Sequence, residues 1–311
     1  MAALHGLGDG RHRPAGAAAR TPAGFLLRYR RLDAQPSRLN RLLLYRASRR
    51  SFAASSVDYR QANRGYEVMS TRALFHEDAY QTRCDATITA IDEAGIHLDQ
   101  TVFYPLGGGQ AGDAGTLTLA DGTVIAIADT RKAKFEGATP DDAVHVPAPG
   151  QEDALAKLKA GHRVSAEIDW ERRYRHMRLH TASHLICAVL PYPVDGCSIT
   201  MDYARLDLAT VEPIEREDVE TKLRELIGGS HDVRTEWITD DEMAARPELV
   251  RTMSVKPPMG LGRVRLLRIE NVDLQPCGGT HVRNTGEIGG LRIAKLEKKS
   301  ARTRRLVLEL A

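Results

Sequence analysis

Two short motifs, far apart in the chain, carry side chains that could bind a metal ion. His176, His180 and His184 stand four residues apart in a helical pattern, so their imidazoles share one face and two neighbours could grip one ion. The turn Cys277-Gly-Gly-Thr-His281 offers a thiolate and another imidazole at the same spacing. Together they supply the borderline-soft tetrahedral set that Zn²⁺ prefers. The sequence therefore predicts one zinc ion per chain, and the spacing leaves open which helical histidines bind it.

The helical motif excludes one zinc chemistry. Zinc peptidases carry His-Glu-x-x-His, in which the glutamate is the general base. Thr181 takes the glutamate's place in His180-Thr-Ala-Ser-His184, so a peptidase is excluded. The plain structural alternative is a histidine pair on a solvated helix face together with an ordinary glycine turn.

The histidines require a helix, and the surrounding pattern predicts one from Trp170 to Pro191, which ends it. A second helix is expected between Glu212-Pro213 and Gly228-Gly229. The predicted strands are Val164 to Ile168, Ile199 to Leu208, Val233 to Ile238, Val264 to Ile269, Gly290 to Leu296 and Arg304 to Leu310. Mixed helices and strands predict an α+β domain over residues 151–311.

The hydrophobic pattern of residues 69–150 differs from that of the second domain and predicts a small all-β barrel. Short alternating runs recur about every ten residues and are separated by glycine turns such as Asp121-Gly122. The runs are Cys84 to Ile91, Gly95 to Leu98, Gly115 to Ala120 and Gly122 to Ile127. The Ala-, Pro- and Gly-rich stretch from Gly137 to Gly150 is expected to link the two domains.

Residues 1–68 are left out of the fold prediction. They hold thirteen Arg, no Lys, three Asp and one Glu, a charge of +9, which leaves −6 on the remaining 243 residues. Such Arg-rich, acid-poor composition is typical of a disordered leader or an organellar transit peptide. Because Met69 also opens an ordinary protein start, a wrongly assigned upstream start is an equal alternative. We expect deletion of residues 1–65 to leave activity intact.

Composition excludes several classes of protein. With 42% hydrophobic and 27% charged residues in 311, the chain is neither disordered overall nor collagenous. No stretch approaches the roughly 18 to 20 apolar residues of a membrane-spanning helix. Four scattered cysteines do not form a secreted disulfide framework, so a reducing, cytoplasmic location is expected.

Three motifs resemble those of a known family. They are Phe103-Tyr-Pro-Leu-Gly-Gly-Gly-Gln110, Arg178-Leu-His-Thr-Ala-Ser-His184 and Gln275-Pro-Cys-Gly-Gly-Thr-His281. Their order and content resemble the freestanding alanyl-tRNA editing proteins of the AlaX type with an N-terminal glycine-rich barrel. The resemblance extends over nearly all of residues 69–311, and it implies the editing fold of threonyl- and alanyl-tRNA synthetases. Because 311 residues leave no room for a class II aminoacylation domain, we expect a stand-alone editor rather than a synthetase.

The resemblance implies a role for individual residues. It makes His180, His184, Cys277 and His281 the zinc ligands and leaves His176 outside. The hydroxyls of Thr181 and Ser183, which lie between ligands, become catalytic candidates; relatives often carry Thr at the position of Ser183. Implied substrate contacts come from a glycine-rich loop and from the turn between the last two ligands: Gly107, Gly108, Gly109, Gln110, Gly278 and Gly279.

The implied activity is hydrolysis of the ester that joins a wrong amino acid, chiefly serine and also glycine in some relatives, to alanine tRNA. A pocket that accepts alanine rejects serine only about a hundredfold, whereas a site that hydrogen-bonds the serine hydroxyl can reject alanine by roughly 10⁴ to 10⁵. Two alternatives stay open: an editor of another mischarged tRNA, and a zinc-stabilised tRNA-binding module without catalysis.

Contact with the tRNA acceptor end requires a local basic patch, because the bulk charge of the folded part is negative. One candidate is a C-terminal run of seven cations: Arg292, Lys295, Lys298, Lys299, Arg302, Arg304 and Arg305. A second group of arginines could extend it: Arg172, Arg173, Arg175 and Arg178. A solvated strand face is the structural alternative for the first run.

Overall fold

The structure of the protein is a computed structural model that describes residues 70–250 and 261–311. These residues all belong to one compact unit of the chain. The predictions for residues 1–68 lie outside the described part. No helix in that part is long and apolar enough to cross a membrane.

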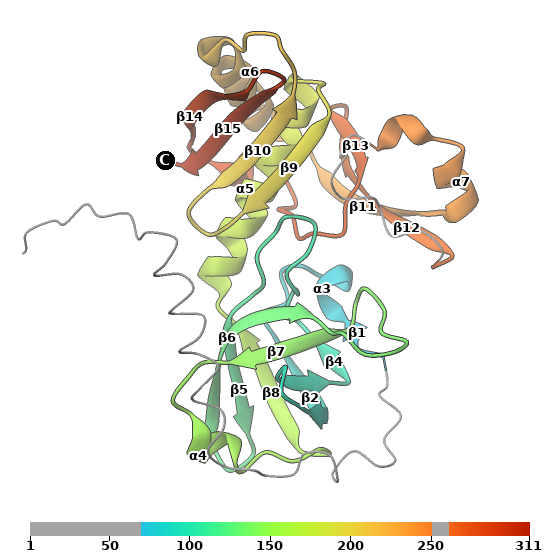
Figure 1. Cartoon of the computed structure of the whole chain (residues 1–311), viewed down its shortest axis with the longest axis vertical. Coiled ribbons are helices and arrows are strands. Elements are labelled where there is room, and N and C mark those ends of the chain that lie inside the picture. Colours follow the sequence, from blue (N-terminus) through green and yellow to red (C-terminus); the bar gives the residue numbers. More distant parts are fainter. Residues whose placement is uncertain (1–69, 251–260) are drawn as a thin grey trace, which may run out of the picture. The chain divides into compact units, whose positions relative to one another are not determined.

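The first described region is a closed antiparallel barrel of six strands, in the order β2-β3-β7-β6-β5-β8 (Figure 1). The strands are β2 (Arg83–Ile91), β3 (Ile96–Leu98), β5 (Gly115–Leu119), β6 (Val124–Lys132), β7 (Ala143–Pro147) and β8 (Arg163–Ile168). Alternate side chains fill the interior, among them Ile88, Leu98, Leu117, Ile125 and Ala166. The short strands β1 (Arg72–Ala73) and β4 (Gln100–Thr101) pair with each other, and the short helices α3 (Leu74–Glu77) and α4 (Glu152–Leu155) complete the region.

The predicted barrel is confirmed, but two strands lie where the sequence suggested otherwise. The expected link from Gly137 to Gly150 contains β7, which pairs with β3 and β6. The Pro and Gly around it hide a five-residue strand. The strand expected at Val164 to Ile168 exists as β8, yet it pairs with β2 and β5 and closes the barrel rather than joining the second domain. The expected boundary near residue 150 therefore precedes the last barrel strand.

Beyond the barrel, helix α5 (Trp170–Val189) runs beside a four-stranded antiparallel sheet in the order β14-β15-β10-β9 (Figure 1). The sheet consists of β9 (Val194–Ile199), β10 (Ala204–Ala209), β14 (Leu291–Ser300) and β15 (Thr303–Leu310). Leu185 of α5 and Leu223 of α6 (Arg216–Gly228) share one core with Leu206 and Leu308 of the sheet. The single strand expected from Ile199 to Leu208 is therefore wrong, because a turn divides that segment between β9 and β10.

A second, three-stranded antiparallel sheet carries the ligand turn. Its order is β11 (Val233–Thr239), β12 (Arg263–Ile269) and β13 (Asp273–Pro276). One face of this sheet buries Val264 and Leu266 with Met243 of the short helix α7 (Asp240–Ala244). Two 3-10 turns, Pro247–Leu249 and Thr285–Ile288, complete the α+β region. Cys277 follows β13 directly, so this sheet fixes where the turn begins.

Candidate metal centre and editing pocket

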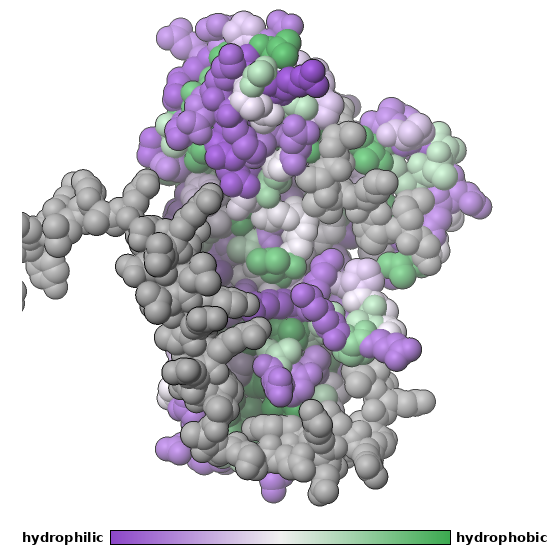
Figure 2. Space-filling view, in the orientation of Figure 1, coloured by the Kyte–Doolittle hydropathy of each residue, from purple (hydrophilic) through white to green (hydrophobic). Residues whose placement is uncertain are grey.

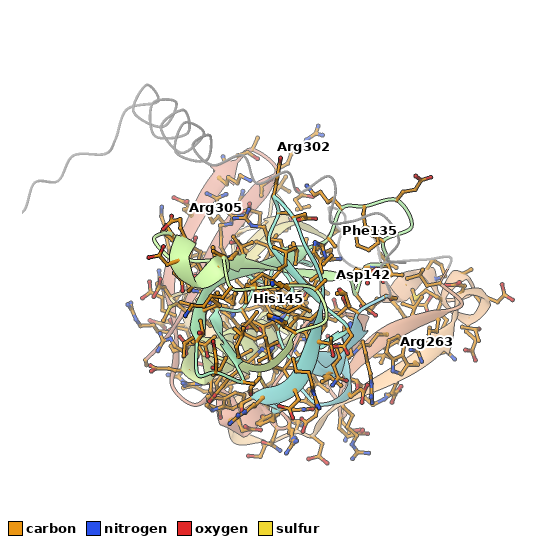
Figure 3. The ribbon with its side chains drawn as sticks, turned by 90° about the horizontal axis from the view of Figure 1, so that it is seen from below. Phe135, Asp142, His145, Arg263, Arg302 and Arg305 are labelled. Atoms are coloured by element: carbon orange, nitrogen blue, oxygen red, sulfur yellow. The ribbon has the colours of Figure 1, made fainter. Side chains whose placement is uncertain are left out.

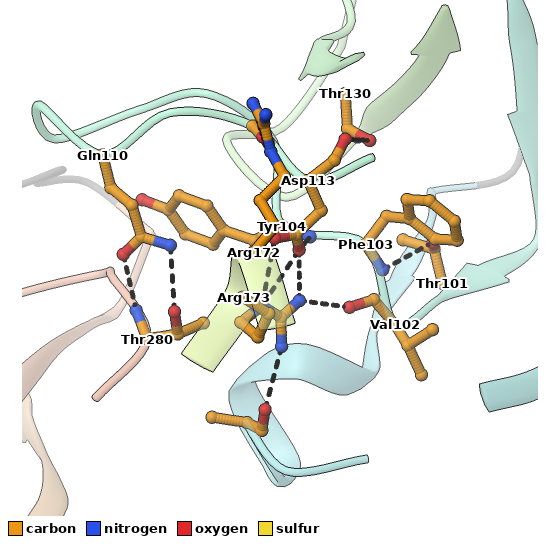
Figure 4. A network of polar contacts seen from close by, with 12 residues as sticks. Thr101, Val102, Phe103, Tyr104, Gln110, Asp113, Thr130, Arg172, Arg173 and Thr280 are labelled. Atoms are coloured by element: carbon orange, nitrogen blue, oxygen red, sulfur yellow. Dashed lines mark hydrogen bonds and ion pairs between the residues drawn. The ribbon is translucent and has the colours of Figure 1, made fainter. Parts of the chain in front are cut away.

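Helix α5 positions both histidines of the first motif, and its own beginning is firmly held. The Asp169 side chain caps the helix by accepting from Arg172 N at 3.1 Å. Arg173, fully buried, donates through Nε to Asp113 Oδ2 at 3.0 Å and through Nη1 to the Ala79 carbonyl at 2.9 Å. This network joins α5 to the loop that follows the glycine-rich motif (Figure 4). The register of the helix relative to that loop is thereby set.

The four predicted ligands meet at one point. The ligand atoms of His180, His184, Cys277 and His281 all lie within 4.8 Å of one another. Cys277 Sγ is 3.5 Å from His180 Nε2 and 3.2 Å from His281 Nε2. A tetrahedral zinc with ordinary Zn–S and Zn–N bonds requires S···N separations of about 3.5 Å. The donor set and its spacing therefore fit zinc, and the group could hold one ion.

Gln110 fixes the tautomer of His180 from the other side of the site. Its Oε1 accepts from the backbone N–H of Thr280 at 3.1 Å, and its Nε2 donates to Thr280 Oγ1 at 2.9 Å, so the orientation of the amide is unambiguous (Figure 4). The same Oε1 lies 2.8 Å from His180 Nδ1. An amide oxygen only accepts, so Nδ1 carries the proton and Nε2 is left to bind a metal.

The other two histidines are held in a comparable way. His184 Nδ1 lies 3.4 Å from Asp273 Oδ2, which also accepts from Gln275 Nε2 at 2.6 Å. His281 Nδ1 lies 3.2 Å from the hydroxyl of Thr181. Each imidazole thus has its outer nitrogen engaged by the protein and its inner nitrogen turned toward the cluster, which is the usual outer-shell arrangement of metal-binding histidines.

The charges within the cluster favour a thiolate. Burial alone would raise the pKa of the Cys277 thiol, but the facing His180 and His281 imidazoles hold it well below its usual value. Burial likewise opposes the charged form of His184, yet its hydrogen bond to Asp273 and the nearby Cys277 sulfur raise its pKa to about 9. For His281, burial comes first and lowers its pKa. The cluster therefore holds a negatively charged sulfur among imidazoles, and this charge favours a bound cation.

The cluster forms one wall of a cavity of about 480 Å³. Ser183 lies at the same wall and is 4% exposed; its hydroxyl donates to the Leu179 carbonyl of its own helix at 2.9 Å. Thr181 is fully buried, and its hydroxyl also accepts from Val282 N at 3.3 Å, so it supports His281 and does not line the cavity. The two hydroxyls predicted as catalytic candidates therefore lie in different environments.

The glycines predicted to contact the substrate also lie in two different environments. Gly108 and both glycines of the ligand turn line the cavity, whereas Gly107 and Gly109 build the loop behind it. Gly109 has a φ of +88°, and a Cβ there would meet the Cys197 carbonyl at 3.0 Å. A Cβ on Gly279 would lie 2.2 Å from His180 Cε1, so only glycine lets the turn approach the helix. The Gly279 N–H points to Cys277 Sγ at 3.4 Å.

Comparison with known proteins shows which family the chain belongs to. The chain is 35% identical to an alanyl-tRNA editing protein AlaX-M of Methanosarcina mazei, over 77% of the chain and 96% of the relative. It is 34% identical to the AlaX-M protein of Methanosarcina acetivorans, over 77% of the chain and 99% of the relative. The chain belongs to the AlaX-type alanyl-tRNA editing proteins. It is also 32% identical to an alanine–tRNA ligase of Sulfurisphaera tokodaii, over 73% of the chain but only 25% of that enzyme.

Two domain families match parts of this AlaX-type protein. Residues 264–307 match the threonyl and alanyl tRNA synthetase second additional domain, which spans the ligand turn and β14. Residues 44–172 match the family described as tRNA synthetases class II (A). Within the described residues, the second match covers the barrel and the start of α5, so it falls on the glycine-rich half of the editor rather than on an aminoacylation sheet.

The basic residues predicted to contact RNA are largely paired. In this AlaX-type protein, Lys299 and Arg305 both bind Asp207 of β10, which is 2% exposed. Arg292 pairs with Glu309 and Lys295 with Glu297, whereas Lys298 and Arg302 form no ion pair with the residues that the structure describes. Hydrophilic side chains gather over this sheet, and Arg302 and Arg305 lie on its last hairpin (Figures 2 and 3). The sequence missed Asp207 and Glu309 as partners because both come from other strands.

The arginines of α5 also have structural partners. Arg172 donates to the Gly112 carbonyl at 3.1 Å, Arg175 to the Met201 carbonyl at 2.6 Å and Arg178 to the Ile288 carbonyl at 2.9 Å. Burial and its pairing with Asp113 exclude Arg173 from RNA contact. His176 is also buried, and burial lowers its pKa to about 4. It does not join the metal-binding group of the described residues.

Proposed function

We propose that the chain is a trans-acting, zinc-containing aminoacyl-tRNA hydrolase that removes serine from mischarged alanine tRNA and spares alanine. Glycine on the same tRNA is proposed as a further substrate. The observation that carries this proposal is the convergence of His180, His184, Cys277 and His281 beside a cavity that also contains Ser183. Family membership supports the reaction class. The protein is proposed to act in the cytoplasm.

Ester hydrolysis needs a positioned water and stabilisation of a tetrahedral oxyanion. Zinc at the cluster would supply Lewis acidity to this chemistry. Gln110 and Asp273, whose oxygens only accept, hold His180 and His184 in the required tautomers, and Thr181 contacts the outer nitrogen of His281. We therefore assign Thr181 to positioning His281, and we keep the Gly278 backbone, exposed at the cavity wall, as the candidate donor to the oxyanion. The Gly279 N–H is already directed at sulfur.

Ser183 is the proposed reader of the substrate side chain. Its O–H is used on the Leu179 carbonyl, so the oxygen presents acceptor lone pairs to the cavity. A serine hydroxyl on the substrate can donate to that oxygen, whereas an alanine methyl would leave the buried acceptor unpaired. One such hydrogen bond corresponds to about a tenfold preference. Glycine lacks the hydroxyl, so its hydrolysis would need a different cause, namely its small size.

A second candidate is a zinc-stabilised tRNA-binding module without catalysis. The specific observation in its favour is that four protein donors converge, since structural zinc sites are closed by four ligands and catalytic sites keep a position open. In that case the metal would only fasten α5 to the turn at Cys277. An editor of another mischarged tRNA would share every feature of the site itself.

Deacylation assays separate these candidates. The full chain is incubated with seryl-, glycyl- and alanyl-tRNA of alanine identity, and with seryl-tRNA of threonine identity. We expect hydrolysis of seryl-tRNA of alanine identity, with alanyl-tRNA left intact. Ser183→Ala should lower the preference for serine over alanine about tenfold, and Ser183→Thr, which keeps the hydroxyl, should retain it. Binding of tRNA without turnover would favour the structural module, and faster loss of the threonine-identity substrate would favour the other editor.

A further inference from the structure

Trp237 is an aromatic side chain at the cavity that belongs to none of the hydrophobic cores of the described residues. It lies on β11 and is 44% exposed. A small core lies on the opposite face, where Val264 and Leu266 pack with Met243 and with the neighbouring Ile238. Successive residues of a strand face opposite sides, so Trp237 points away from this core. Its indole lines the same cavity as His180 and Cys277.

The neighbours of Trp237 hold it in place and connect it to the cluster. Trp237 is directly opposite Arg265 in the β11–β12 pairing, and Arg263 is two residues from Arg265 on the same face. The Arg263 guanidinium lies 4.2 Å from the centroid of the indole ring (Figure 3 labels Arg263). Arg265 is buried and donates through Nη1 to the Cys277 carbonyl at 2.8 Å and to the Gly279 carbonyl at 2.9 Å. Two residues of β12 therefore contact the indole and the ligand turn: Arg263 lies over Trp237, and Arg265 binds the carbonyls of the turn.

This combination suits a nucleobase. Bases of single-stranded RNA ends stack on aromatic rings and on guanidinium planes, and this contact tolerates any base because every base has a π-face. An aminoacyl ester at the cluster is covalently joined to a terminal ribose. The base on that ribose must therefore lie along the wall of the cavity. Lys132, also at that wall, supplies a cation for the backbone phosphate.

We propose that Trp237, held by Arg263, is the stacking platform for the terminal base of the substrate's acceptor strand. The proposal rests on the proposed function, because it requires the aminoacyl group to lie at the cluster. It assigns recognition of the acceptor end to the cavity's own wall rather than to the C-terminal basic run, most of whose cations are already paired with carboxylates.

Fluorescence tests the platform directly, because the chain has two tryptophans. The other, Trp170, stacks on Tyr174 at 5.3 Å and does not line the cavity, so Trp170→Phe isolates the emission of Trp237. The probe is a cytidylyl-cytidylyl-adenosine trinucleotide, and the matched control is the same molecule with an abasic terminal ribose. We expect saturable quenching by the trinucleotide and at least about tenfold weaker binding of the abasic control. Equal quenching by both would overturn the platform.

Kinetics supply a second readout in the unaltered background. Trp237→Ala should raise KM for seryl-tRNA of alanine identity about tenfold more than KM for serine methyl ester, which has no base. Trp237→Phe, which keeps a stacking ring, should restore most of the loss. Val124→Ala is the control, since Val124 is 52% exposed on the barrel and does not line the cavity. Equal KM shifts for both substrates would contradict stacking.

The two proposals can fail separately. If the unaltered protein hydrolyses neither seryl-tRNA nor serine methyl ester, the proposed hydrolysis is wrong, while base-dependent quenching would still support the platform. If both esters are hydrolysed but quenching does not depend on the terminal base, only the platform is wrong.

Discussion

Helix α5 carries two buried polar centres two turns apart, and they differ in how their donors and acceptors are used. At the first, Arg173 and Asp113 are both fully buried, and every direction is taken by the protein: Asp113 also accepts from Tyr104 N at 2.6 Å. At the second, the outer nitrogens of His180, His184 and His281 are engaged, but their inner nitrogens and the Cys277 sulfur face one another. A buried pair whose polar atoms all have partners in the protein has a structural role. Ligand atoms that converge on one another indicate a binding site.

Removal of a cluster ligand should have the largest effect. Cys277→Ala deletes the sulfur and its charge, so we expect metal affinity to fall on the order of 10³-fold and deacylation to be lost. Metal analysis after dialysis, with about one zinc per unaltered chain, measures this. Cys197→Ala is the control, because Cys197 lines the same cavity but lies outside the cluster. Full metal content in Cys277→Ala would show that the ligand assignment is wrong.

Disruption of the Arg173–Asp113 pair should have nearly as large an effect, but on the free energy of unfolding rather than on metal affinity. Arg173→Met leaves Asp113 charged and buried without its partner, which is expected to lower the free energy of unfolding by about 3–5 kcal/mol. Adding Asp113→Leu removes the stranded charge and should recover much of the loss. Denaturant unfolding checks both.

The control for this pair is Arg72→Ala, which breaks an exposed ion pair with Glu77. That change should leave the denaturation midpoint within error. If Arg173→Met were equally silent, the buried pair would not be the element that holds α5 to the barrel.

The fold could be predicted where local patterns are strong, and less well where pairing is distant. The long helix and most strands follow from period and turn residues, yet β7 was missed because Pro and Gly surround Ala143 to Pro147. The assignment of β8 to the barrel depends on pairing with β2, which begins eighty residues earlier. A local sequence pattern does not show which distant strand a segment pairs with.

The site shows the same limit. Spacing proposed the imidazoles and the thiolate, and the family resemblance selected His180 over His176. The resemblance placed Gln110 among substrate contacts, and its hydrogen bonds to His180 and Thr280 were not predicted. Asp273 was not foreseen, since its partner His184 lies 89 residues away. Groups that act through another residue leave little trace in a motif.

The outer partners of the cluster provide the third prediction. Gln110→Ala removes the acceptor that fixes the His180 tautomer, and loss of such a partner typically costs about 10–100-fold in metal affinity. Competition with a chelator measures the change. Gln81→Ala is the matched control, since among the described residues the Gln81 side chain bonds only to the Arg83 carbonyl, at the surface. An unchanged affinity in Gln110→Ala would mean that the ligands are positioned by the helix and the turn alone.

The last prediction concerns pH and a buried histidine whose ring nitrogens both have partners in the protein. His145 is enclosed in the barrel, with its ring nitrogens 2.8 Å from Thr101 Oγ1 and 3.0 Å from the Ile96 carbonyl, and burial lowers its pKa to about 4 (Figure 3). The unfolded chain takes up this proton near pH 6.5, so the free energy of unfolding should fall as pH drops from about 6.5 to 4, by about 1.4 kcal/mol per pH unit. His145→Gln removes that proton, and urea unfolding at several pH values should show a slope reduced by this amount. Part of the slope should remain, because His176 has its pKa lowered in the same direction. Identical slopes in both proteins would show that His145 is not the group that takes up the proton on unfolding.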